Sequence, residues 1–162
     1  MRRAPHGGAV PVDAIGPAEL DALSGLIDRW AAGESATAPV LLAVDHDPAE
    51  RRWYVRLRGE EKAVTTVWLT LRERTLHVET HFMPAPEENA EALYEYLLRI
   101  NTRLFAVRFA IGAEDAVYLV GQLPVTAVDE AELDRLVGSA YAYSELYFRP
   151  AMRIGFASRF TG

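Results

Sequence analysis

Polar residues alternate with apolar residues in the segment Leu76–Phe82, LHVETHF. In an extended strand, side chains two positions apart project from the same face, about 6 to 7 Å apart. His77, Glu79 and His81 would therefore share one face. Two imidazoles and a carboxylate are ligand types that zinc accepts, and two histidines on one face could switch an interface near neutral pH. The segment is either a metal or acid–base site, or the solvent-exposed face of an amphipathic strand.

The spacing favours the solvent-exposed face. The zinc motif H-E-x-x-H uses helical spacing, whereas ligands on a flat strand converge only if they lean together or another segment caps them. The candidates for a further ligand, Asp45, His46 and Asp47, lie in a connector that the pattern does not place. We therefore expect no metal and no cofactor. A metal-binding sensor or a metal-assisted enzyme built on the three strand residues remains the alternative.

No other pattern in the chain predicts a reaction. P-loop, G-x-G-x-x-G and G-x-S-x-G motifs are absent, and no serine stands in a Ser/His/Asp arrangement. The absence of cysteine excludes disulfides and thiolate-bound metals. A formal net charge of −6 lacks the electrostatic footprint of a protein that binds nucleic acid. We therefore expect a protein that is not an enzyme and has no nucleic acid partner.

Apolar residues at spacings of three and four predict three amphipathic helices. They fall near residues 17–33, 87–101 and 129–149. Asp129 and Glu132 stand in the relation of a capping box at the start of the third helix. Pro150 should break or kink that helix, because proline removes a backbone donor and its ring crowds the preceding turn.

Five segments alternate apolar and polar residues with the period of a half-buried strand. They cover residues 51–60, 63–73, 75–82, 104–112 and 116–124. In the fourth segment, Phe105, Val107, Phe109 and Ile111 are expected to face the core. Residues 40–44, VLLAV, form either a short strand or apolar padding over the core. The connections within the first three strands are too short for a crossover and predict antiparallel hairpins.

The element order is therefore α-β-β-β-α-β-β-α, which predicts an α+β fold. We expect one antiparallel five-stranded sheet with helices mainly on one face and water on much of the other. Residues 1–15 are expected to form a flexible arm, residues 16–157 a single domain and residues 158–162 a tail. No stretch approaches the roughly 20 apolar residues of a membrane helix, and no apolar segment follows the N-terminal arginines. We expect a cytoplasmic protein.

The polar faces of the first three strands suggest a binding surface. A tryptophan among polar neighbours is costly to expose to water, and tryptophan and arginine are enriched at binding hot spots. Trp68 therefore either contacts a partner or packs beneath the N-terminal arm or the connector of residues 34–50. The predicted partner-binding residues are Tyr54, Arg56, Arg58, Trp68, His77 and His81.

The element order resembles that of the YbjN-domain family, with the passage WYVRLRGEEKAVTTVWLTLRERTLHVETHFMPAPEENAEALYEYLLRIN at its centre. Its members are also described as type III secretion chaperone-like proteins or bacterial sensory transduction regulators. The likeness covers residues 16–155 and rests on element order and on the strand–Pro–helix passage HFMPAPEENAEALYEYLLRIN. It implies a chaperone-like or adaptor protein with a protein or peptide partner and no cofactor. Because the chaperone branch is typically dimeric, it also implies a homodimer.

Overall fold

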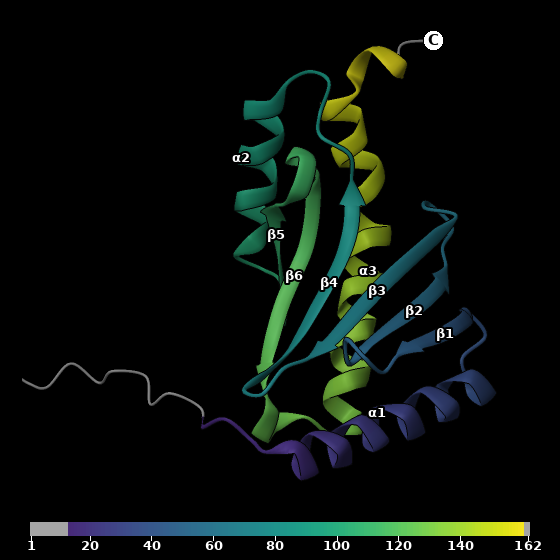
Figure 1. Cartoon of the computed structure of the whole chain (residues 1–162). Helices are drawn as coiled ribbons and strands as arrows, with labels where there is room; N and C mark the ends of the chain where they lie inside the picture. Colours follow the sequence, from purple (N-terminus) through teal and green to yellow (C-terminus); the bar gives the residue numbers. More distant parts are fainter. Residues whose placement is uncertain (1–12, 161–162) are drawn as a thin grey trace, which may run out of the picture.

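The computed structural model describes residues 13–160, in three helices and six strands (Figure 1). Residues 1–12 of the expected arm (residues 1–15) and the last two residues of the expected tail lie outside this range. The helices are α1 (Pro17–Thr37), α2 (Ala90–Asn101) and α3 (Glu130–Gly155). The strands are β1 (Leu41–Asp47), β2 (Arg52–Arg58), β3 (Val64–Leu71), β4 (Thr75–Met83), β5 (Val107–Ile111) and β6 (Val117–Pro124).

The strands form one antiparallel sheet in the order β1-β2-β3-β4-β6-β5. The α+β prediction is confirmed, but the predicted number of five strands is wrong. The sixth strand is β1, which includes most of the VLLAV run and pairs with β2 from Leu41 to Asp47. No residue of β1 is fully buried, and its half-buried and exposed positions do not alternate strictly, so sequence periodicity did not separate it from a connector.

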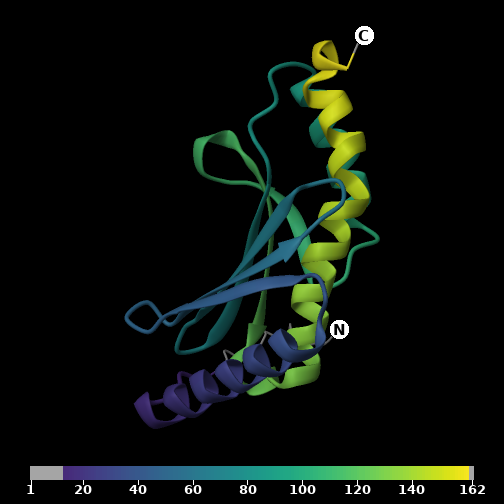
Figure 2. The ribbon, with the colours of Figure 1, turned by 90° about the vertical axis from the view of Figure 1, so that its right-hand side faces the viewer.

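One face of the sheet packs against the helices. The inward residues of β2, β3 and β4 are almost fully buried, as the period of two requires; they include Trp53, Val55, Val67, Leu69, Val78 and Phe82. Helix α3 contributes Leu133, Leu136 and Ala140 to the same core. Figure 2 shows α3 along this side of the sheet, and in the described part of the chain no helix lies on the other side.

One predicted helix end is wrong, and the break that was one of the two outcomes expected at Pro150 does not occur. Helix α1 does not end at Gly33 but continues to Thr37, before the extended residue Ala38 and Pro39. Helix α3 continues through Pro150 to Gly155. The carbonyl that loses its partner there belongs to Leu146, and both residues are exposed, so water can satisfy it. One of the two hydrogen bonds of the predicted capping box is confirmed: the Asp129 carboxylate accepts the backbone N–H of Glu132 at 2.8 Å.

The fourth predicted strand is shorter than expected. Strand β5 begins at Val107, after Ala106 has turned the chain with a positive φ of 63°. Phe105 and Ile111 were expected in the core, but they are 73% and 54% exposed. The two central positions, Val107 and Phe109, are buried as expected. No helix within residues 13–160 is long and apolar enough to cross a membrane.

Candidate functional site

The sheet face opposite the helices, here called the open face, gathers most of the predicted binding residues. In the register of the sheet, Trp68 on β3 lies between Tyr54 on β2 and Glu79 on β4. Tyr54 meets Trp68 edge-on at 5.9 Å between ring centroids. The Arg52 guanidinium lies 5.8 Å from the centre of the Trp68 ring. Trp68 is therefore partly buried by neighbours on its own sheet face and not by a helix.

The open face is hollowed beside Trp68. A cavity of about 400 Å³, here called the cup, is lined by Tyr54, Arg56, Lys62, Val64, Thr66, Trp68 and His81. Four of these seven were predicted from the sequence as partner-binding residues: Tyr54, Arg56, Trp68 and His81. Its walls combine aromatic rings with two cationic side chains, the composition found at binding hot spots.

Lys62 is the charged residue of the cup that sequence reasoning missed. It is the only lysine of the chain and lies in the turn between β2 and β3. Its Nζ donates to the backbone carbonyls of His81 at 2.7 Å and Phe82 at 3.1 Å, where a bulge interrupts the register of β4 with β6. The ammonium also lies 5.5 Å from the centre of the Phe148 ring on α3. Its uniqueness was the one signal available in the sequence.

Two side chains of the cup, Lys62 and His81, have lowered pKa values. Burial lowers the pKa of the Lys62 ammonium to about 8, although the Glu145 carboxylate opposes the shift. Burial and the positive charge of Lys62 lower the pKa of His81. At neutral pH the cup therefore presents mostly charged Lys62 beside neutral His81.

The turn that carries Lys62 is fastened to α3. The Glu145 carboxylate accepts the backbone N–H groups of Glu60 at 2.7 Å, Glu61 at 3.0 Å and Lys62 at 3.4 Å. The turn needs glycine at position 59, because a Cβ there would lie 2.0 Å from the Lys62 carbonyl oxygen and 2.3 Å from Glu145 Oε1. This close approach fixes the position from which the Lys62 side chain enters the cup.

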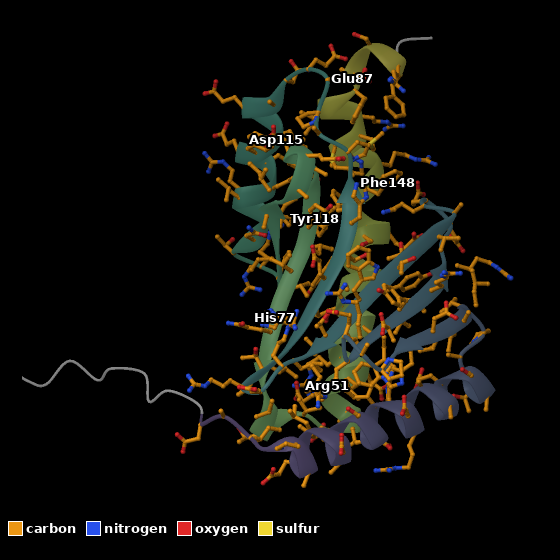
Figure 3. The ribbon with its side chains drawn as sticks, viewed as in Figure 1. Arg51, His77, Glu87, Asp115, Tyr118 and Phe148 are labelled. Atoms are coloured by element: carbon orange, nitrogen blue, oxygen red, sulfur yellow. The ribbon has the colours of Figure 1, made fainter. Side chains whose placement is uncertain are left out.

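The three candidate metal ligands do not converge. His77 bonds Thr75 Oγ1 at 2.9 Å, and His81 packs edge-on against Tyr118 at 5.3 Å. Figure 3 shows His77 closer to the end of the sheet near α1 than Tyr118 is. Within residues 13–160, no three His, Asp or Glu side chains are grouped as a metal site would require. The structure therefore gives no support to the alternative of a metal sensor or metal-assisted enzyme.

The remaining candidates lie apart from the cup. His77 is exposed on β4 and does not line the cup. Arg58 is exposed at the end of β2, opposite Val64. His46, considered as a further ligand, stacks on Trp53 at 4.2 Å and lies 3.2 Å from Asp28 of α1. Its role is in the attachment of α1 to the sheet.

A second surface lies between α2 and β5, here called the α2–β5 groove. Its cavity of about 350 Å³ is lined by Tyr94, Leu97, Leu98, Phe109, Ala110, Ile111 and Val117. Leu98 is 65% exposed, and Ile111 is also mostly exposed. Strand β5 is the edge of the sheet here, with no strand on its outer side. Exposed apolar residues beside an open strand edge mark a contact surface.

The sequence matches one protein family over most of the folded domain. The model of the YbjN family, described as "Putative bacterial sensory transduction regulator", matches residues 40–151. Uncharacterized proteins of Mycobacterium leprae and Mycobacterium tuberculosis are each 36% identical to the chain, over 107 and 104 residues. These alignments cover 66% and 64% of this chain. They cover 58% and 57% of the two relatives, so the chain spans less than two thirds of their lengths.

Solved structures with the same fold include chains of type III secretion complexes. A chain of the HopA1–SchA chaperone–effector complex aligns with a TM-score of 0.58 and 9% identity, over 83% of this chain and 98% of its own. A chain of the ExoU–SpcU complex of Pseudomonas aeruginosa aligns with a TM-score of 0.55 and 16% identity, over 77% and 96%. A chain of the Yersinia pestis SycH–YscM2 complex aligns with a TM-score of 0.51 and 18% identity, over 75% of this chain and 96% of its own. At these identities the likeness is one of fold.

Proposed function

Because the chain belongs to the YbjN family, we propose that it is a non-enzymatic protein-binding module, a chaperone-like or adaptor protein of the bacterial cytoplasm. It holds a protein or peptide segment on the open face of its sheet. The observation that carries this proposal is the partly buried Trp68 in the wall of the cup, on a sheet face that no described helix covers. The fold it shares with chains from chaperone complexes supports the same class.

The chemistry of the open face favours binding over catalysis. Trp68 and Tyr54 offer ring surface. Arg56 offers a charge that, among residues 13–160, pairs only with exposed Asp45, at 3.4 Å. Exposed ion pairs of this kind contribute little to stability, so they are readily exchanged for contacts with a partner. We therefore expect Tyr54, Arg56 and Trp68 to carry most of the binding energy, with Arg58, His77 and His81 at the margin.

The test is affinity capture from the lysate of the native organism, with Trp68→Ala beside the wild type. Leu98→Ala is the matched control, because it also removes an apolar side chain but lies in the α2–β5 groove. We expect a specific protein to be retained by wild type and Leu98→Ala and lost by Trp68→Ala, with thermal midpoints within a few degrees. Loss by Leu98→Ala alone, or collapse of the Trp68→Ala fold, would overturn the proposal.

The α2–β5 groove supports a homodimer as the assembled form. The exposed side of α2 is acidic in its first half, with Glu91 and Glu95, and basic near its end, with Arg99. Antiparallel pairing of two α2 helices about a two-fold axis would bring opposite charges together and cover Leu98 in both protomers. Light scattering should give twice the monomer mass for wild type and the monomer mass for Leu98→Asp. A monomeric wild type at micromolar concentration would contradict the assembly.

A further inference from the structure

We propose that the cup is a carboxylate-binding subsite, which takes an acidic side chain of an extended partner segment while a neighbouring apolar residue packs on Trp68. This inference rests on the proposed function, because the same sheet face holds the segment. It specifies the chemistry of the partner, which neither the fold nor the family match provides.

The charges in the lining are of one sign. Arg56 and Lys62 are both cationic, and no Asp or Glu lines the cup. Carboxylates lie beside the cup but not in its lining. Asp45 pairs with Arg56 at 3.4 Å and Glu79 lies opposite Trp68 in the register. Glu145 is bound by the amides of the β2–β3 turn, and Glu61 pairs with Arg149 at 2.8 Å. A concave, one-sign surface in a chain of net charge −6 attracts the opposite charge locally.

The Lys62 ammonium keeps one donor for an anion. An ammonium has three N–H donors, and the carbonyls of His81 and Phe82 use two of them. The third has no acceptor among the described residues, so it can donate to a bound carboxylate. Burial already disfavours the charged ammonium, as its pKa of about 8 indicates. A bound anion restores some of the electrostatic stabilisation lost on burial.

Arg56 can supply the second contact. Its guanidinium offers a planar fork that suits a carboxylate, and Asp45 engages it through one nitrogen at 3.4 Å. Strands place alternate side chains on one face about 6 to 7 Å apart. In an extended partner segment, an acidic residue bound in the cup and an apolar residue two positions later would therefore point the same way. Both would contact the open face, where Trp68 and Tyr54 lie side by side.

The probe is a nonapeptide with blocked termini that carries glutamate at its centre and phenylalanine two positions later, compared with peptides carrying glutamine or lysine at the centre. The readout is the set of three tryptophan indole N–H signals in heteronuclear NMR spectra. The indoles of Trp30 and Trp53 are buried and donate to Asp134 at 2.7 Å and Asp28 at 2.8 Å. Titration should therefore move the Trp68 signal selectively.

We expect the glutamate peptide to bind at least about tenfold more tightly than the glutamine peptide, and the lysine peptide to bind least, as loss of a charge-assisted contact implies. Arg56→Gln and Lys62→Gln should each weaken the glutamate peptide about tenfold. Arg74→Gln removes the same charge in the exposed β3–β4 turn, outside the cup, and should change affinity less than about twofold. The cup could also take the carboxylate at the C-terminus of a partner chain. A version of the glutamine peptide with a free C-terminus tests this alternative to an acidic side chain.

Three outcomes would overturn the inference. They are equal affinity of the glutamate and glutamine peptides, equal weakening by Arg56→Gln and Arg74→Gln, and binding that needs only the free C-terminus. If a captured protein depends on Trp68 but the peptides show no charge preference, the proposed function stands and the carboxylate subsite fails. If the glutamate peptide binds the cup but wild type captures no protein, the carboxylate subsite stands and the proposed function fails.

Discussion

The carboxylate of Glu145 accepts the backbone N–H group of Glu60 at 2.7 Å, although 85 residues separate the two in the chain. Through this bond and its companions to the next two amides, α3 holds the β2–β3 turn that carries Lys62. A distant helix therefore determines where one wall of the cup stands.

Removing this carboxylate should loosen the turn. In Glu145→Ala the three amides lose their acceptor, and we expect the free energy of unfolding to fall by about 1 to 3 kcal/mol. Hydrogen exchange at Glu60 and Glu61 should accelerate more than exchange in the strands on either side. Glu95→Ala, which removes an exposed carboxylate on α2, is the control. Unchanged exchange in the turn would show that the strands alone hold it.

Lys62 should make stability depend on pH in the alkaline range. Its pKa is about 8 in the folded protein, below the ordinary value of 10.5, so the unfolded chain binds more protons between these values. The free energy of unfolding contributed by Lys62 therefore rises as pH increases through that window and is smallest below pH 8. Urea denaturation from pH 7 to 10.5 should show wild type gaining stability relative to Lys62→Met. Parallel curves would contradict a lowered pKa.

The attachment of α1 should depend on Asp28. Its Oδ1 accepts the indole N–H of Trp53, a side chain that is fully buried on β2. Asp28→Ala leaves that donor without a partner and should cost about 1 to 3 kcal/mol. Asp28→Asn keeps an acceptor oxygen and should cost less. Equal losses for the two variants in thermal or urea denaturation would argue that the charge, not the hydrogen bond, matters.

Two buried hydroxyls leave room for stabilising substitutions. Thr65 Oγ1 and Ser144 Oγ are buried and have no hydrogen-bond partner within residues 13–160. Because a buried polar group without a partner is unfavourable, Thr65→Val and Ser144→Ala should each raise the free energy of unfolding by about 1 kcal/mol. The midpoint of urea denaturation measures this change. A fall in the midpoint would indicate that an ordered water satisfies the hydroxyl.

The central strands could be predicted from the sequence because one of their faces is buried. Trp53, Val55 and Leu69 alternate with polar residues, and this period fixed the face on which Trp68 lies. The edges were harder to predict. An edge strand such as β1 has only one neighbouring strand, and Phe105 and Ile111 lie in or beside the other edge, where an apolar pattern does not imply burial.

The candidate site could be predicted only in part for a related reason. Periodicity places residues on a face, so it identified Tyr54, Arg56, Trp68 and His81 together. It carries no information about which turn folds back over that face. Lys62 enters the cup because Glu145 of α3 fixes its turn, a contact across 83 residues of sequence that no local pattern contains.

Because the chain has a single lysine, the cup can be labelled selectively through an amine. Amine-reactive dyes and crosslinkers have only the Lys62 side chain and the N-terminal amine to modify in this chain. A crosslink from Lys62 to another protein would therefore report a neighbour at the cup and nowhere else on the folded domain. For the same reason, amine coupling to a sensor surface would immobilise the protein either through its N-terminal amine or through the face proposed to bind its partner.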